Sequence, residues 1–280
     1  MGNIPEIPVD STGKTIPVIG FGTAEYPFGA SFETLRDSLL HAIKLGYRHF
    51  DSAALYQSEQ PLGEAIDAAL GLGLIKSRDD LFITSKLWCS DAHHDCVLPA
   101  IQKTLNVKPG EYELPVKKKD LLPIDIKSVW EAMEECQKLG LAKSIGVEMN
   151  PLWQQKKLRE SCKNKGIRIT AYSPLGAKGT LWGTNWVMEC EVLKQIAEAT
   201  GKTIAQICIR WVYEQGVSVL VKSFNKDRMK ENLDIFDWKL SPEDLEKISQ
   251  IPQRKGFPGL EFISEEGPYK SLSELWDGEI

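Results

Sequence analysis

The stretch SFETLRDSLLHAIKLGYRHFDSAALY, residues 31–56, contains one complete helix–glycine–strand unit of the kind that decides this fold. Its first part carries apolar residues at helical spacing along one face: Leu35, Leu39, Ala42 and Ile43. Gly46 stands where this helix should end, because glycine adopts the left-handed conformation that closes a helix at little cost. The apolar run 47–52 that follows predicts a buried strand.

The same alternation of strand and helix runs along the chain. Short apolar runs, typical of strands buried on both faces of a parallel sheet, occupy residues 16–21, 47–52, 81–87, 144–147, 167–172 and 217–221. Helices are predicted at 33–45, 60–70, 96–105, 126–139, 152–164, 187–199, 204–214 and after Ser241-Pro-Glu-Asp. Because no linker interrupts this order, we expect residues 1–280 to form a single α/β domain.

Two segments interrupt this alternation of predicted strands and helices. Residues 106–125 contain three prolines and a lysine run, and they predict no buried strand. The strand at 144–147 leads directly into Glu148-Met-Asn-Pro151, although a parallel strand needs a crossover of about a dozen residues before the next one. Six candidate strands remain, where a closed (β/α) barrel needs eight. The residues alone therefore leave open a six-stranded open sheet and a barrel that has lost parts.

The composition is that of an ordinary globular protein. A net charge of -5 argues against a surface for nucleic acid. The six cysteines are scattered without a CxxC pair, which favours a reducing compartment. No secretory signal and no apolar stretch of membrane-spanning length is found. We therefore expect a cytoplasmic protein without nucleic-acid or membrane partners, and nothing in the sequence requires more than a monomer.

Three polar residues stand at or just beyond the ends of two neighbouring strands: Asp51, Tyr56 and Lys86. Enzymes with parallel sheets place their sites at the carboxyl ends of the strands. These side chains can form a proton-transfer unit in which the Lys86 ammonium stabilises the phenolate of Tyr56 and Asp51 orients Lys86. The alternative is structural: a helix cap, a packed tyrosine and a solvated lysine.

A second candidate site follows the last strand, in Val221-Lys-Ser-Phe-Asn-Lys-Asp-Arg228. Its polar residues gather at a strand-to-helix turn: Lys222, Ser223, Asn225 and Arg228. Backbone N–H groups and the helix dipole favour a phosphate at such a turn, and Arg228 can bind it through two parallel hydrogen bonds. The alternative is an exposed, charged first turn of a helix.

Four segments, in this order, resemble the aldo-keto reductases: Gly20-Phe-Gly-Thr-Ala24, Gly46-Tyr-Arg-His-Phe-Asp-Ser-Ala-Ala-Leu-Tyr56, Leu81-Phe-Ile-Thr-Ser-Lys-Leu-Trp88 and the segment 221–228. The resemblance covers almost the whole chain, from Ile16 to Asp277. The segments 130–136, 153–159 and 210–216 resemble the plant branch that includes chalcone reductase and codeinone reductase. The resemblance implies a (β/α)8 barrel of TIM type, here incomplete, that binds NADPH and reduces an aldehyde or ketone.

The resemblance also implies roles for residues that match the family's motifs. Tyr56 resembles the acid that protonates the carbonyl oxygen, with Lys86 and Asp51 as its partners. The implied contacts with the cofactor are Lys222, Ser223, Asn225 and Arg228 at the adenosine 2′-phosphate, Glu231 and Asn232 at the adenine, Gly22, Thr23 and Tyr172 at the nicotinamide, and Phe224. Trp88 resembles a wall of the substrate pocket, and no metal is implied.

The two breaks fall where the family carries further site residues. Between Thr104 and Gly110 the family has its fourth strand, which ends in the histidine that orients the substrate carbonyl, and this segment is missing here. His93 and His94 lie in the loop after Trp88 and do not replace it. Around Val147 the family's next helix is missing, together with the strand ends whose Ser, Asn and Gln hold the nicotinamide.

Two functions follow from this comparison of motifs. One is an NADPH-dependent reductase of a small-molecule carbonyl substrate in plant specialised metabolism, with Tyr56 as the general acid. The alternative is a truncated variant of such a reductase that only binds NADPH or does not fold stably, because removing a barrel strand exposes the edges of both neighbours. The sequence does not identify the substrate itself.

Overall fold

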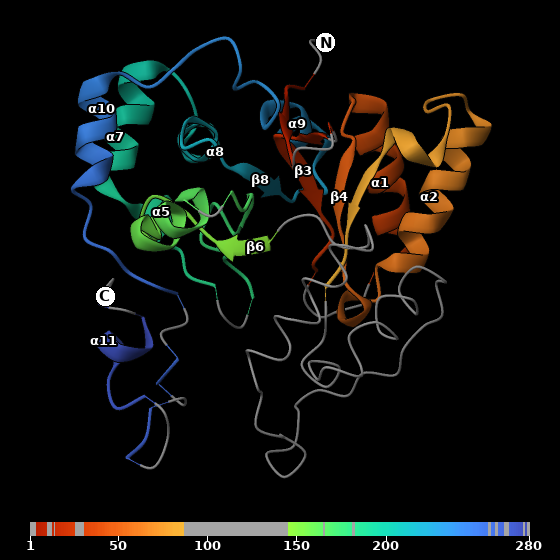
Figure 1. Ribbon diagram of the computed structural model, residues 1–280. Helices are drawn as coiled ribbons and strands as arrows, with labels where there is room; N and C mark the ends of the chain where they lie inside the picture. The colour runs from red at the N-terminus through yellow and green to blue at the C-terminus, as the bar shows by residue number, and fades with distance from the viewer. Residues whose placement is uncertain are drawn as a thin grey trace. The chain divides into compact units, whose positions relative to one another are not determined.

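The structure is a computed structural model, and it describes residues 4–9, 13, 15–25, 31–86, 145–164, 166–180, 183–256, 259–260, 263–265, 269–276 and 278. The chain divides into two compact units (Figure 1). The first combines Met1–Lys143 with Lys222–Met229, and the second combines Ser144–Val221 with Lys230–Ile280. Within the described ranges, no helix has both the length and the apolar character needed to cross a membrane.

The first unit is built on three parallel strands, β3 (Ile19–Gly22), β4 (His49–Asp51) and β5 (Phe82–Thr84), with β4 in the middle. The register places Asp51 opposite Gly22 on β3 and opposite Thr84 on β5. Before β3, the strands β1 (Glu6–Pro8) and β2 (Thr15–Pro17) form an antiparallel pair. Asp51 is therefore held from both sides at the carboxyl end of the central strand.

Two helices, α1 (Phe32–Leu45) and α2 (Glu59–Gly71), pack against each other in this unit (Figure 1). The face of α1 predicted from the spacing of its apolar residues is the buried face. Gly46 ends α1 with φ at 100°, and its N–H contacts the carbonyls of Ala42 and Ile43. Two short 3-10 helices, η1 (Ala54–Tyr56) and η2 (Arg78–Asp80), complete the described secondary structure between β4 and β5.

Aromatic packing fixes the strands of the first unit. The ring centroid of Phe21 lies 5.6 Å from that of Tyr47 and 6.2 Å from that of Phe50, and all three side chains are fully buried. The Tyr47 hydroxyl donates a 2.9 Å hydrogen bond to the carbonyl of Met229. Because burying one such ring contributes about 2–3 kcal/mol, this cluster holds both the strand ends and the segment that contains Met229.

The second unit also contains three parallel strands, β6 (Ile145–Glu148), β7 (Ile169–Tyr172) and β8 (Ser218–Val221), with β7 in the middle. β6 pairs with β7 from Ile145↔Ile169 to Glu148↔Tyr172. Its helices are α5 (Lys156–Asn164), α6 (Trp186–Glu189), α7 (Glu191–Thr200), α8 (Ile204–Glu214), α10 (Pro242–Ser249) and α11 (Leu272–Leu275). The short helix α9 (Lys226–Glu231) begins in the first unit and ends in the second.

Each of the six predicted strands is confirmed by a strand that overlaps its range, with β3 and β6 each ending one residue later than predicted. The pairings within the two sets of three are parallel. The helix predicted at 187–199 is wrong as a single helix, because the backbone at Cys190 is extended and separates α6 from α7. The helix predicted from residue 152 begins at Lys156, since Asn150 and Trp153 form a tight bridge before it. The predicted helices 96–105 and 126–139 and the break at 106–125 lie outside the described residues.

Candidate active site

The carboxylate of Asp51 and the ammonium of Lys86 form an ion pair at the end of β4. Lys86 Nζ donates to Asp51 Oδ1 at 2.5 Å and to the carbonyl of Ser52 at 3.0 Å. The Asp51 side chain is 9% exposed and that of Lys86 is 34% exposed. Burial raises the pKa of the Asp51 carboxyl, and the charge of Lys86 and its hydrogen bond oppose that rise. Lys86 therefore favours the ionised form of Asp51 at a buried position where desolvation favours the neutral form.

Tyr56 lies next to Lys86. It ends η1, where its N–H contacts the carbonyl of Ala53, and Gln57 follows it in a left-handed conformation with φ at 54°. Lys86 Nζ lies 4.8 Å from the centroid of the Tyr56 ring, within the range of a cation–π contact. The structure thus brings together the three residues singled out from the sequence, with Lys86 in contact with both of the others.

A row of buried hydroxyl groups lies next to this ion pair. Thr23 Oγ1 is 2.6 Å from Ser58 Oγ, and Ser58 Oγ is 2.8 Å from Ser52 Oγ. The N–H of Thr23 also contacts the carbonyl of Asp51 at 3.0 Å. Thr23 is fully buried and is bonded to the last residue of β4, while Gly22 beside it is partly exposed. The two serines carry no pattern in the sequence that distinguishes them, and sequence reasoning missed them.

A buried histidine stands two residues before Asp51. His49 is fully buried, its Nε2 lies 3.0 Å from Thr84 Oγ1, and its ring packs edge-on against Phe82 with centroids 5.1 Å apart. Burial lowers the pKa of His49 to about 3. The imidazole is therefore neutral at physiological pH and acts as a packed polar group in β4, not as a second cation beside Lys86.

The predicted phosphate-binding turn forms the start of α9. Asn225 Oδ1 accepts a 3.0 Å hydrogen bond from the N–H of Arg228, and Ser223 Oγ accepts a 3.1 Å bond from the N–H of Asn225. Lys222 Nζ lies 4.2 Å from the ring centroid of Phe224. Burial lowers the pKa of Lys222, and the charge of Glu25 opposes that change. The side chains of Lys222 and Ser223 and the backbone of Arg228 thus belong to one turn at the start of α9, and residue types of this kind at a helix start suit a phosphate.

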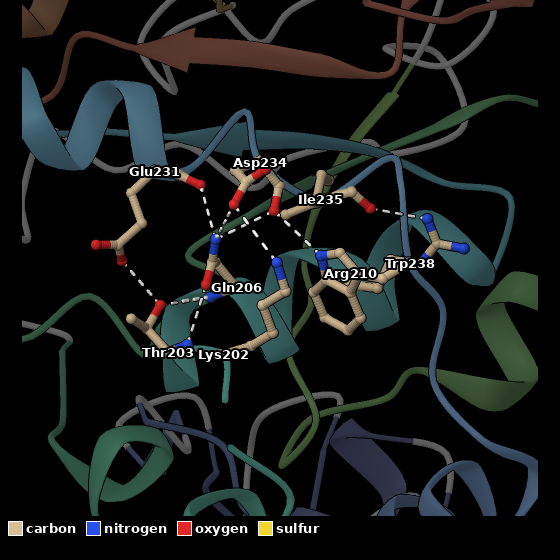
Figure 2. A network of polar contacts seen from close by, with 8 residues as sticks. All are labelled: Lys202, Thr203, Gln206, Arg210, Glu231, Asp234, Ile235 and Trp238. Atoms are coloured by element: carbon tan, nitrogen blue, oxygen red, sulfur yellow. Dashed lines mark hydrogen bonds and ion pairs between the residues drawn. The ribbon is translucent and has the colours of Figure 1, made fainter. Parts of the chain in front are cut away.

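Three further predicted cofactor contacts belong to the second unit. Tyr172 ends β7 with 38% of its surface exposed. Glu231 is partly exposed at the end of α9, and its Oε1 accepts a 2.8 Å hydrogen bond from Thr203 Oγ1 (Figure 2). Asn232 follows it and is only 5% exposed. The predicted pocket residue Trp88 lies outside the described residues, as do His93 and His94.

Comparisons with known proteins identify the class of this α/β chain. The family model for the aldo/keto reductase family matches residues 18–149 and 147–253. The 7-acetyl-epi-neemfruitin B aldo-keto reductase of Melia azedarach is 58% identical over 99% of this chain and 98% of its own length. The (1S)-1,7-diacetoxy-luvungin A aldo-keto reductase of Citrus sinensis is 56% identical over 99% of both chains. A crystal structure of a Bombyx mori aldo-keto reductase in complex with NADP matches with a TM-score of 0.79 and 29% identity, over 96% of this chain and 99% of that one.

The strand order and these matches define an oxidoreductase with a barrel of (β/α)8 type. The chain belongs to the aldo/keto reductase family. Its six described parallel strands are consistent with an incomplete barrel of that type, as the family resemblance implied. Of the two folds that the residues alone left open, the barrel with missing parts is the one that the matches support.

The matches also locate a discontinuity. The alignment with the Melia azedarach reductase runs over 318 positions, whereas this chain has 280 residues, so at least 38 positions (318 against 280) have no residue in this chain. The family model matches in two pieces that meet at residues 147–149, inside and just after β6. The overlap of the two matched pieces lies at the end of β6, at the same place as the second break expected from the sequence.

Proposed function

We propose that this chain reduces an aldehyde or ketone to an alcohol with NADPH, and that Tyr56 is the general acid. The observation that carries this proposal is the position of Lys86 Nζ, 2.5 Å from Asp51 Oδ1 and 4.8 Å from the Tyr56 ring centroid. When Tyr56 gives its phenolic proton to the carbonyl oxygen of a substrate, the phenolate that remains is stabilised by the adjacent ammonium. Asp51 keeps that ammonium oriented. NADPH, when bound, supplies the hydride.

The donor set at the start of α9 supports NADPH as the cofactor. Lys222, Ser223 and Arg228 offer two positive charges and a hydroxyl, which match the 2′-phosphate that distinguishes NADPH from NADH. Phe224 and Asn225 fix the turn that presents them. Gly22, Thr23, Tyr172, Glu231 and Asn232 remain proposed contacts of the rest of the cofactor, and Trp88 remains a proposed wall of the substrate pocket.

The substrate class that we propose is a carbonyl compound of plant specialised metabolism. The two plant relatives are named as reductases for 7-acetyl-epi-neemfruitin B and for (1S)-1,7-diacetoxy-luvungin A, which supports an oxygenated small molecule as substrate. We further propose that the chain acts in the cytoplasm as a monomeric, single-domain enzyme.

A second candidate function has its own supporting observation. The missing alignment positions and the overlap of the two family-model matches at the end of β6 favour a truncated variant that binds NADPH without turnover or does not fold stably. In the family, the histidine and the Ser, Asn and Gln side chains that orient the substrate carbonyl and the nicotinamide come from segments absent here. In such a variant the phosphate turn and the Tyr56–Lys86 contact persist while the geometry of hydride transfer is lost.

One experiment separates these functions. The purified chain is titrated with NADPH and with NADH, and quenching of the fluorescence of its eight tryptophans is followed. Saturation with a clear preference for NADPH supports the cofactor site, and consumption of NADPH with a panel of ketones and aldehydes, absent from Tyr56→Phe, supports catalysis. Saturable binding without turnover supports the truncated binder. No saturation with either nucleotide overturns NADPH binding by this chain.

A further inference from the structure

The N-terminus of α8 holds the segment that follows α9 through a network of side chains (Figure 2). Thr203 and Gln206 form a capping box: the Thr203 hydroxyl accepts from the N–H of Gln206 at 3.2 Å, and Gln206 Oε1 accepts from the N–H of Thr203 at 3.0 Å. Such a box satisfies backbone donors at the start of a helix. Here both side chains also bind residues outside α8, at Glu231 and Asp234, and a helix cap does not require such contacts.

Gln206 fixes the backbone of the segment after α9. Its buried amide nitrogen lies 3.3 Å from the carbonyl oxygen of Glu231, 3.1 Å from that of Asp234 and 3.3 Å from Asp234 Oδ2. Three more donors bind the same segment: Lys202 to Asp234 Oδ2, Trp238 to the Asp234 carbonyl and Arg210 to the Ile235 carbonyl. The end of α9 is therefore held rigidly against α8.

Thr203 fixes the side chain of Glu231. Its hydroxyl hydrogen goes to Glu231 Oε1 at 2.8 Å, and the described residues give Glu231 Oε2 no hydrogen bond. Glu231 is partly exposed while Asn232 is 5% exposed, so Glu231 is the better placed of the two to meet a ligand. A carboxylate oxygen accepts hydrogen bonds only, which matches the exocyclic amino group of adenine and opposes the carbonyl oxygen that hypoxanthine carries at the same position.

We propose that Thr203 is a positioning residue that aims Glu231 at the adenine amino group, and that this pair gives the chain a preference for adenine over hypoxanthine in the cofactor. This inference rests on the proposed binding of NADPH. Since Thr203 acts through Glu231, its effect falls on the affinity for one end of the cofactor and not on the hydride-transfer step.

Two substitutions separate this role from helix capping. Thr203→Asp keeps an acceptor for the N–H of Gln206, because aspartate is a good N-cap residue, but it has no hydrogen to donate and its charge repels Glu231. Thr203→Ser keeps both the acceptor and the hydroxyl hydrogen. The ligands are NADPH and its deamino analogue, in which hypoxanthine replaces adenine.

We expect wild type and Thr203→Ser to bind NADPH more tightly than the deamino analogue by about tenfold, the effect of about 1.4 kcal/mol. In Thr203→Asp this ratio falls toward one, the KM for NADPH rises with little change in kcat, and the urea midpoint of unfolding stays near that of wild type. In a Glu231→Ala background the Asp substitution has no further effect on the ratio.

The inference is overturned if Thr203→Asp prefers NADPH over the deamino analogue as strongly as wild type does. If the same variant still binds NADPH more tightly than NADH, the proposed function is unaffected by that result. The inference is also overturned if Glu231→Ala keeps the wild-type preference for NADPH over the deamino analogue, because Glu231 then does not distinguish adenine from hypoxanthine. If wild type binds neither nucleotide, the proposed function fails and the inference fails with it.

Discussion

Replacing Lys86 by methionine tests the electrostatics of the candidate site without any assumption about substrate. The substitution keeps the length of the side chain and removes its charge, which leaves Asp51 buried beside no cation within hydrogen-bonding distance among the described residues. Breaking one side of a fully buried ion pair costs about 3–5 kcal/mol. Because a third of the Lys86 side chain is exposed, water screens part of the interaction, and we expect a loss of about 2–3 kcal/mol at pH 7.

The pH dependence of that loss is the diagnostic part of the prediction. Burial already raises the pKa of Asp51 above its unfolded value of 3.8, and without Lys86 it rises further. Between the unfolded and the folded pKa the native state binds more protons than the unfolded state, so stability falls as pH rises through that window and returns on acidification. The variant is therefore expected to lose more stability at pH 8 than at pH 5, relative to wild type at the same pH.

Urea unfolding of wild type, Lys86→Met, Asp51→Asn and the double variant at pH 5 to 8 measures this effect. The double variant should recover to within about 1 kcal/mol of wild type at pH 7, since no buried charge is left without a partner. Contributions from other titrating groups are common to all four proteins and cancel in the differences. A loss in Lys86→Met that is the same at pH 5 and pH 8 would refute the argument that a buried, partnered Asp51 carboxylate exists in this protein.

Three further predictions concern single positions. Tyr56→Phe is expected to lower carbonyl reduction about a hundredfold or more while leaving the Kd for NADPH unchanged, because it removes one proton donor; turnover within twofold of wild type contradicts its role as the acid. Arg228→Leu should raise the Kd for NADPH about tenfold and leave that for NADH unchanged, as fluorescence titration will measure; equal changes for both nucleotides place the 2′-phosphate elsewhere. The pKa of His49 is about 3 in the folded protein, against an ordinary value of 6.5. Below pH 6.5 the unfolded chain therefore binds a proton that the folded protein does not, and the free energy of unfolding falls by up to about 1.4 kcal/mol per pH unit. Urea midpoints of His49→Gln should therefore fall less steeply between pH 7 and pH 5, and equal slopes in the two proteins contradict the assignment.

The sequence predicts the regular elements well where end signals and apolar spacing agree. The helix predicted at 204–214 has the same limits in the structure, because Thr203 and Gln206 form its capping box and the apolar residues keep one face buried. The division at Cys190 was not predictable, since neither proline nor glycine marks it and the apolar spacing continues through it.

Part of the candidate site was predictable because parallel strand pairing fixes which strand ends lie together. Asp51 and Lys86 belong to neighbouring strand ends, and parallel pairing brings such ends together whatever the loops do. The hydroxyls of Ser52 and Ser58 were missed, because serine is common in loops and only the folded turn places the two side chains in contact. The Thr203–Glu231 bond joins residues 28 positions apart and likewise depends on tertiary packing.

The row formed by Thr23, Ser58 and Ser52 has one more consequence. In each of its two hydrogen bonds either oxygen is able to act as the donor. All three hydroxyls can therefore turn together, and the row then reverses its polarity while no heavy atom moves. The three hydroxyls thus form a dipole whose direction the positions of their heavy atoms leave open.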